Sequence, residues 1–214
     1  MKKNTQAQGF YIYGIVRAGA PLHADCCGVD KRWPRIEEIR SDDICAVVSR
    51  VPREPIAATR EHLLAHERVN RAVLADRTVI PMAFGTQCRS REDVAQVLRS
   101  GYDAFSEALE QMNGKLEFGL QGYRHGDTAA GTDRAVPEIL RQLGDVSLAS
   151  RLNAPFGPGM VMNAAFLVQR SGEAGFDHGV REISQRYPDL MFKRSGPWPP
   201  YNFVRIRLQL ERPS

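Results

Sequence analysis

Hydrophobic residues recur along this chain with two different periods, which predict strands and helices in alternation. Apolar runs rich in β-branched and aromatic residues predict strands at 10–16 (FYIYGIV) and 44–51 (ICAVVSRV). Residues 59–77 place Val69 and Val73 on one side of a helical wheel, so we expect a helix there. Further strands are expected at 78–86, 115–123, 160–169, 190–194 and 201–210.

Helix signals mark three further segments. Ser90 followed by Asp93 resembles a capping box, and Gly114 stands where a helix would end, so one helix is expected between them. Apolar residues at helical spacing predict two more helices, at 133–143 and 176–187. Pro81 confines the strand at 78–86 to a sheet edge or a bulge, because proline cannot donate to the ladder.

The order of these elements predicts an α+β protein with two domains. Residues 124–133 carry glycines without periodicity, so we place the domain boundary between 1–123 and 124–214. Each half alternates strands with helices, which fits a small α/β sandwich whose sheet has its helices packed on one face. We see no repeat of fixed period in the sequence.

Composition and charge narrow the function classes. The chain has 214 residues, 43% of them hydrophobic, and a formal net charge of +4. No long block of like charges signals a nucleic-acid arm or a membrane patch, and no apolar run is long enough to span a membrane. The four cysteines lack metal-ligand spacing and fit reduced thiols of a cytosolic protein, and the first ten residues lack the apolar core of a signal peptide.

The sequence gives only weak signals for a catalytic or metal site. His62 and His66 have the i, i+4 spacing of paired zinc ligands, so a small metal-dependent enzyme is one alternative. The HExxH order is absent and His66 falls in the apolar stripe, which favours a hydrogen-bonded core histidine. Cys88 and Ser90 lie near a helix start, where we favour a structural thiol and a capping serine. No glycine-rich nucleotide motif is present, so we expect no cofactor and no enzyme activity.

RNA binding is a second alternative. The aromatic strand YIYGIV at 11–16 is similar to a base-stacking strand of an RNA-recognition motif. The companion motif with paired aromatics is missing, so we do not expect a nucleic-acid partner.

The segment SGPWPPYNFV, 195–204, is the most distinctive part of the chain. Its prolines stiffen the approach to the expected last strand, and a stiff segment loses little entropy when a partner docks. In that strand, one face would carry core residues such as Val204 and Ile206. Tryptophan, tyrosine and arginine are enriched at binding hot spots. The residues we expect to bind a partner are Trp198, Tyr201, Phe203, Arg205 and Arg207. The alternative role for the prolines and Trp198 is structural, as a turn and a plug at the end of the sheet.

Several motifs in order resemble the gas vesicle proteins of the GvpF/GvpL family. They are YIYGIV (11–16), AVVSRVP (46–52), HERV (66–69), VIPMAFGT (79–86), KLEFG (115–119), MNAAFLV (162–168) and GPWPPYNFV (196–204). The resemblance covers nearly the whole chain, and the tryptophan–proline motif is the most specific of the set.

The resemblance implies a fold, a role and partners. Each domain would be a variation on the ferredoxin-like fold. The protein would be a cytoplasmic accessory protein, associated with gas vesicles, that binds the hydrophobic shell protein and other gas vesicle proteins during assembly. No catalytic activity or cofactor comes with the resemblance.

Overall fold

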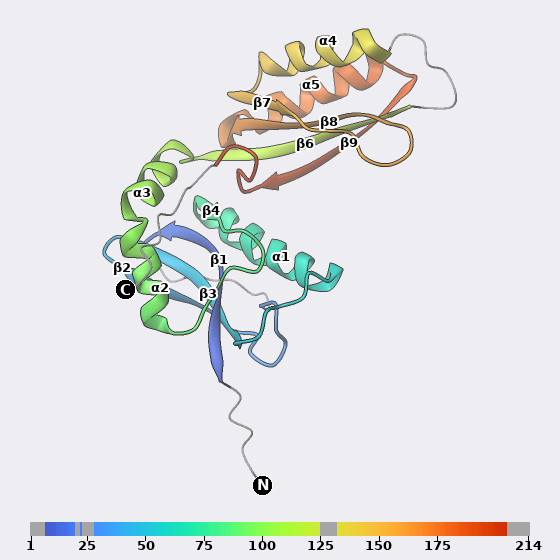
Figure 1. Cartoon of the computed structure of the whole chain (residues 1–214). Helices are drawn as coiled ribbons and strands as arrows, with labels where there is room; N and C mark the ends of the chain where they lie inside the picture. The colour runs from blue at the N-terminus through green and yellow to red at the C-terminus, as the bar shows by residue number, and fades with distance from the viewer. Residues whose placement is uncertain (1–6, 20–21, 23–27, 125–131, 205–214) are drawn as a thin grey trace. The chain divides into compact units, whose positions relative to one another are not determined.

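The protein consists of two compact units (Figure 1). The computed structural model describes residues 7–19, 22, 28–124 and 132–204. The first unit contains the described residues up to Asn113 and also Val204, and the second is Gly114–Phe203. This division lies ten residues before the boundary expected between 123 and 124, because strand β6 (Lys115–Arg124) pairs with two strands from the second half of the chain.

The first unit is built around one antiparallel sheet. Its strand order is β2-β3-β1-β4, and β5 also pairs with β1. The strands are β1 (Gln8–Arg17), β2 (Ile36–Ser41), β3 (Ile44–Pro52), β4 (Val79–Pro81) and β5 (Gln87–Cys88). The expected strand at 78–86 is therefore short, and Pro81 ends it at the sheet edge, as expected. Strand β2 was not expected from its sequence, IEEIRS.

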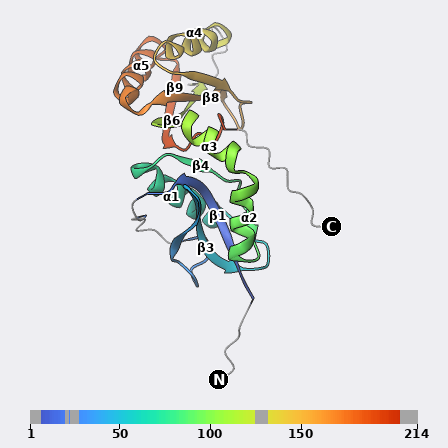
Figure 2. The same cartoon turned by 90° about the vertical axis from the view of Figure 1, so that its left-hand side faces the viewer.

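Helices cover both faces of this first sheet. They are α1 (Arg60–Asp76), α2 (Arg91–Ser100) and α3 (Tyr102–Gln111). Glu38 of β2 pairs with Arg77, just after α1, at 2.7 Å, whereas its neighbour Glu37 pairs with Arg91 of α2 at 3.9 Å. Successive strand residues point to opposite faces, so α1 and α2 lie on opposite sides of the sheet (Figures 1 and 2). This differs from the expected packing on one face and explains why β1 is buried on both of its sides.

The helix expected between Ser90 and Gly114 is two helices. The capping box is present, since the Ser90 hydroxyl accepts from the Asp93 N–H and the Asp93 carboxylate accepts from the Ser90 N–H. The helix is then interrupted at Gly101, which ends α2 and precedes α3. Gly114 follows in the left-handed conformation (φ 67°), which glycine adopts without strain.

The second unit has the ferredoxin-like order of elements. Its sheet has the strand order β7-β8-β6-β9, all antiparallel. In chain order its elements are β6, α4 (Thr132–Gly144), β7 (Ala149–Leu152), β8 (Met160–Gln169), a 3-10 turn η1 (Arg170–Gly172), α5 (Glu173–Arg186) and β9 (Leu190–Trp198). Helices α4 and α5 lie on one face, as expected (Figure 1). There, Phe176 of α5 packs on Phe118 and Phe166, with ring centroids 5.3 Å apart in each pair.

The two units share one strand order. β2-β3-β1-β4 in the first corresponds to β7-β8-β6-β9 in the second. Between β1 and β2, however, the described residues contain no helix, whereas α4 joins β6 to β7 in the second unit. The first unit is therefore a variation on the ferredoxin-like arrangement.

The prediction of a last strand at 201–210 is wrong for its first four residues. Strand β9 extends to Trp198, past the segment 190–194 that we expected. Tyr201–Phe203 form a turn and Val204 is not in a strand. Residues 205–210 of the expected strand lie outside the described residues.

Candidate partner-binding site

The segment 195–204 begins inside the second sheet. Trp198 lies opposite Glu117 of β6, and Ser195 lies opposite Gly119, so β9 contains a bulge between them. Gly196 has a φ of 106°, and a Cβ there would come within 2.8 Å of the Glu117 carbonyl oxygen. The Trp198 indole N–H donates to the Ser195 hydroxyl at 3.2 Å. Only glycine fits position 196, and the bulge determines where the tryptophan ring lies.

A turn follows the strand directly. Pro199 and Pro200 are buried, and their carbonyl oxygens accept hydrogen bonds from the N–H groups of Tyr201 (2.7 Å) and Phe203 (3.1 Å). Tyr201 is 40% exposed. The prolines therefore form the inner side of the turn, and Tyr201 is its most exposed aromatic residue.

Asn202 fastens this turn to the sheet through Glu117. The Asn202 backbone N–H donates to Glu117 Oε2 at 2.7 Å, and its side-chain amide donates to Oε1 at 2.6 Å. Glu117 is only 4% exposed, and burial raises the pKa of its carboxyl group while the two hydrogen bonds from Asn202 act in the opposite direction. A buried carboxylate is retained here because both of its oxygens have donors.

The same asparagine also reaches the far edge strand. Arg151 of β7 donates to the Asn202 carbonyl oxygen at 3.1 Å, and the Asn153 amide donates to Asn202 Oδ1 at 3.4 Å. Strand β8 lies between β6 and β7. The turn therefore crosses β8 on the face opposite the helices, where Leu167 lies in register with Glu117 and is 5% exposed.

Arg194 supports the strand from the helical side. Its guanidinium donates to Glu173 at 2.9 Å and to Asp177 at 3.1 Å, and lies 4.3 Å from the Phe118 ring centroid. It also donates to the Gly196 carbonyl oxygen at 3.0 Å. Contacts on both faces of the sheet thus hold the segment in one conformation.

The structure brings only part of the predicted site together. Trp198 and Phe203 are half-buried and Tyr201 is exposed, all within six residues of chain. Arg205 and Arg207 lie outside the described residues. Sequence reasoning missed Glu117 and Asn202, because a glutamate in an alternating strand reads as a solvent-facing residue and gives no sign of a partner 85 positions away.

A second cluster of motif residues forms the core of the first unit. The Tyr11 hydroxyl lies 3.0 Å from His66 Nδ1 and accepts from the Gly85 N–H at 3.0 Å. The Phe84 ring packs against both side chains, with centroids 5.9 Å away in each case. Burial lowers the pKa of His66 to about 4, so the ring is neutral at physiological pH. The motifs YIYGIV, HERV and FGT therefore meet in one packed cluster.

The burial of this cluster argues against the RNA-binding alternative. Tyr11 and Tyr13 have no exposed surface, and both rings pack near His66 of α1. Stacking on bases requires exposed ring faces. The aromatic strand therefore belongs to the core and offers no stacking platform.

The paired histidines have separate roles. His62 Nδ1 lies 2.7 Å from the carbonyl oxygen of Ala57, whereas His66 is buried and bonds Tyr11. Within the described part of the chain, no group of three His, Cys, Asp or Glu residues could hold a metal ion. The expectation of a hydrogen-bonded core histidine at His66 is confirmed.

Cys88 lacks the environment of a nucleophile. Burial raises the pKa of its thiol to about 11, and nearby Asp93 acts in the same direction. Ser90 caps α2, as expected. The pair therefore has a structural role.

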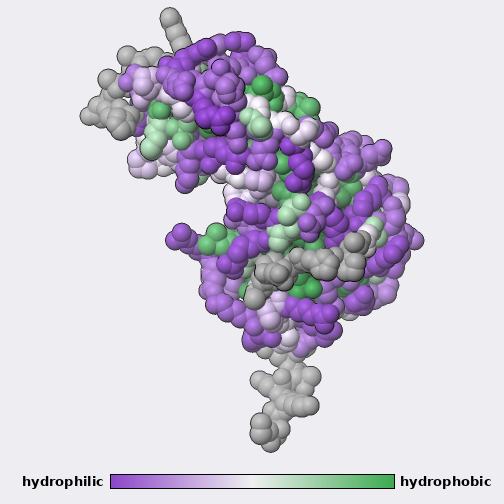
Figure 3. Space-filling model, turned by 180° about the vertical axis from the view of Figure 1, so that it is seen from behind, coloured by the Kyte–Doolittle hydropathy of each residue, from purple (hydrophilic) through white to green (hydrophobic). Residues whose placement is uncertain are grey.

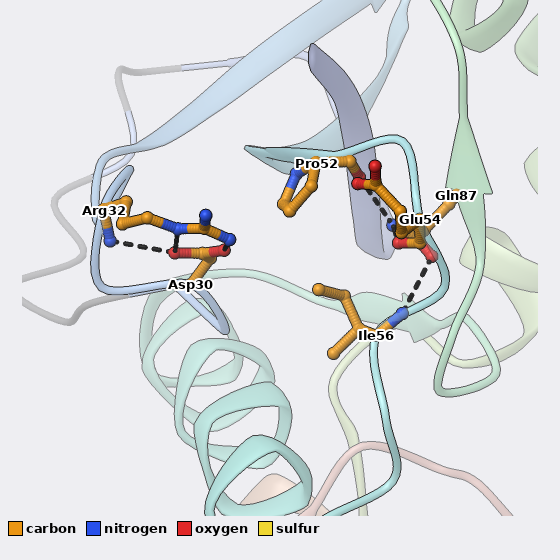
Figure 4. A network of polar contacts seen from close by, with 6 residues as sticks. All are labelled: Asp30, Arg32, Pro52, Glu54, Ile56 and Gln87. Atoms are coloured by element: carbon orange, nitrogen blue, oxygen red, sulfur yellow. Dashed lines mark hydrogen bonds and ion pairs between the residues drawn. The ribbon is translucent and has the colours of Figure 1, made fainter. Parts of the chain in front are cut away.

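A hollow of about 430 Å³ lies in the first unit, beside the start of α1. Arg32 donates its backbone N–H and its guanidinium to the Asp30 carboxylate (Figure 4). Gln87 accepts from the Ile56 N–H and donates to the Pro52 carbonyl oxygen at 3.3 Å each. The first bonds fix the loop at 30–32, and the second tie the segment 52–56 to β5, so each of these two parts of the lining is held in place.

Seen from behind, the face of the described residues is mainly hydrophilic, and its hydrophobic residues form small, separate patches (Figure 3). No helix in the described residues has the length and apolar character needed to cross a bilayer.

Comparisons with known proteins connect this architecture to one family. The family model described as "Gas vesicle synthesis protein GvpL/GvpF" matches residues 9–132 and 127–205. Gas vesicle protein F1 of Halobacterium salinarum is 29% identical over 96% of this chain and 97% of its own length. Gas vesicle protein F2 of the same organism is 31% identical over 94% of each chain.

Solved structures show the same fold. The crystal structure of gas vesicle protein GvpF from Anabaena sp. superposes with a TM-score of 0.86 at 20% identity, covering 96% of this chain and 99% of that one. GvpF from Microcystis aeruginosa superposes with a TM-score of 0.80 at 19% identity, covering 92% and 99%.

Proposed function

The chain belongs to the gas vesicle synthesis protein GvpL/GvpF family, and from this membership we propose that it is an accessory protein of vesicle assembly. It binds the hydrophobic shell protein and other gas vesicle proteins while the vesicle forms. The observation that carries the proposal is the match over nearly the whole chain to relatives named gas vesicle protein F.

The protein acts by binding and not by catalysis. Its family is a gas vesicle protein family and not a known enzyme family. Two residues considered as candidates for catalysis, His66 and Cys88, support this proposal. His66 is neutral and enclosed, and Cys88 is a protonated thiol. It needs no cofactor and no nucleic acid, and it works in the cytoplasm in association with gas vesicles.

The partner-binding surface includes the turn after β9. Tyr201 is exposed on a turn whose conformation is held by Asn202 and by buried prolines. A segment ordered before binding loses little entropy on docking. Trp198 and Phe203 are half-buried beside it. Arg205 and Arg207, the other residues of the proposed site, follow in the chain.

Gene deletion tests the role itself. In a host with the complete gas vesicle gene cluster and no paralogue, removing this gene is expected to abolish or strongly reduce vesicles, and the wild-type gene in trans should restore them. Vesicle yield is counted by electron microscopy. Normal yield without the gene would contradict the proposal.

A further inference from the structure

The edges of the two sheets differ in how they are protected from pairing with another chain. Exposed sheet edges usually carry charges, prolines or bulges that prevent strand addition. Three of the edge strands described here carry such features: Glu37, Glu38 and Arg40 in β2, Pro81 in β4, and Lys193, Pro197 and the bulge in β9.

Strand β7 lacks these features. Its sequence ASRL contains neither proline nor lysine, and its pairing with β8 has no register shift. Leu148, just before the strand, and Leu152, its last residue, have 56% and 54% of their surface exposed. Its one charged side chain, Arg151, donates to the Asn202 carbonyl oxygen across the sheet and so reaches away from the free edge.

The backbone of β7 has outward-facing hydrogen-bonding groups. The N–H groups of Leu148 and Asn153, which flank the strand, donate to Leu167 and Asn163 of β8, each at 2.7 Å. Leu148 lies before the regular ladder of β7, so the alternation within the strand is counted from Asn153. In an antiparallel ladder, the N–H and C=O groups of alternate residues point to the same side, so Arg151 also points to β8. Ser150 and Leu152 therefore direct their N–H and C=O groups away from β8, toward the free edge.

We propose that this edge pairs with β7 of a second copy of the chain, antiparallel and about a two-fold axis at Ser150. In that register the Leu152 side chain of each copy lies beside the Leu148 side chain of the other, while the Leu148 N–H stays bonded to β8. Arg151 lies opposite Ala149, so no like charges face each other. The two four-stranded sheets then form one continuous sheet.

The edge is self-complementary, which is the reason for a second copy as the occupant. A two-fold interface uses the same patch on both subunits, so each patch must fit itself. Between 146 and 156 the chain has the exposed apolar residues Val146, Leu148, Leu152 and Phe156 and a single charge. Because only a short strand pairs, we expect a weak dimer with a Kd in the micromolar range, roughly 10–100 μM.

Charge substitution at the two-fold axis tests the proposal. Ser150 is exposed, so Ser150→Lys and Ser150→Glu should each fold, and circular dichroism checks this. Each variant alone places like charges opposite each other and is expected to stay monomeric by sedimentation velocity, whereas an equimolar mixture of the two should dimerise. Leu152→Lys should also abolish the dimer. The control is Met191→Lys on β9, where Met191 is 58% exposed, and it should leave the dimer unchanged.

Three results would overturn the proposal. They are a wild-type chain that stays monomeric at several times the expected Kd, a dimer that survives both Ser150 substitutions, and a mixture of the two variants that fails to associate. A dimer that forms in the mixture, but not with either variant by itself, would support both the pairing edge and its register.

Discussion

Asn202 donates to both carboxylate oxygens of Glu117, a residue 85 positions earlier in the chain, at 2.7 and 2.6 Å. Through this pair the tryptophan–proline motif closes over the open face of the second sheet. The motif is therefore a folding element as well as the proposed binding segment, and these two roles can be separated by experiment.

Asn202→Asp is expected to destabilise the protein by about 3 kcal/mol at neutral pH, because it sets a second carboxylate against the buried one. The loss should shrink in acid, where one carboxyl can donate to the other. Urea unfolding measures both effects. Asn113→Asp, at an exposed position, is the control and should change stability by no more than about 0.5 kcal/mol.

Glu117→Gln combined with Asn202→Asp should recover part of the loss, since glutamine can donate to the new carboxylate. A double variant no more stable than Asn202→Asp alone would show that the contact between these side chains does not hold the turn.

Stability should fall on acidification because of His66. Its pKa is about 4 in the folded protein against 6.5 unfolded, so the unfolded chain binds the extra proton between these values. The contribution is complete above about pH 6.5 and is lost as the pH falls to about 4, a change of about 3 kcal/mol. His66→Gln should flatten this part of the pH profile of unfolding. His178→Gln, whose side chain is 65% exposed, should not, and an equal effect of both variants would argue against His66 as the source.

Two glycine substitutions should have opposite signs. Gly196→Ala forces a Cβ into a position with φ 106° and a contact of 2.8 Å to backbone, so we expect a loss of about 2 kcal/mol or more. Gly175→Ala lies within α5 with nothing within 4 Å, and should gain about 0.5–1 kcal/mol from helix propensity. Thermal melting of both variants checks the pair. A neutral Gly196→Ala would mean that the bulge is easily rearranged.

Tyr201→Ala should weaken capture of gas vesicle partners while leaving the melting temperature nearly unchanged, because Tyr201 is partly exposed. Phe203→Ala is expected to weaken capture with a larger cost in stability, since Phe203 is half-buried. Pull-down with individually co-expressed gas vesicle proteins measures the effect. Met191→Ala removes a 58% exposed apolar side chain on β9 of the same unit and is the control. If Tyr201→Ala and Phe203→Ala both capture partners like wild type, the partner surface lies elsewhere.

Local patterns in the sequence were sufficient for most individual elements. Helix α1 and strand β8 follow from periodicity, and the start of α2 follows from Ser90 and Asp93, because these signals involve residues only a few positions apart. The buried role of His66 also follows from its place in an apolar stripe. Strand β2 could not be found in this way, because a sheet edge tolerates the charged sequence IEEIRS, which shows no clean alternation.

Pairing between distant segments was decided only by the tertiary structure. Strand β6 belongs to the second unit because β8 and β9 pair with it, and no composition change near Asn113 announces this. The helices of the first unit lie on both faces of its sheet, as the ion pairs of Glu38 with Arg77 and of Glu37 with Arg91 show, and these pairs also join residues far apart in the chain.

The segment around Trp198 also has features that the local sequence determines and others that only the tertiary structure decides. Its prolines determine by themselves that the chain is stiff there, since they restrict φ and remove N–H donors. Whether Tyr201–Phe203 continue as a strand or turn across the sheet depends on a carboxylate that comes 85 positions before Asn202, and the local sequence contains no record of that contact.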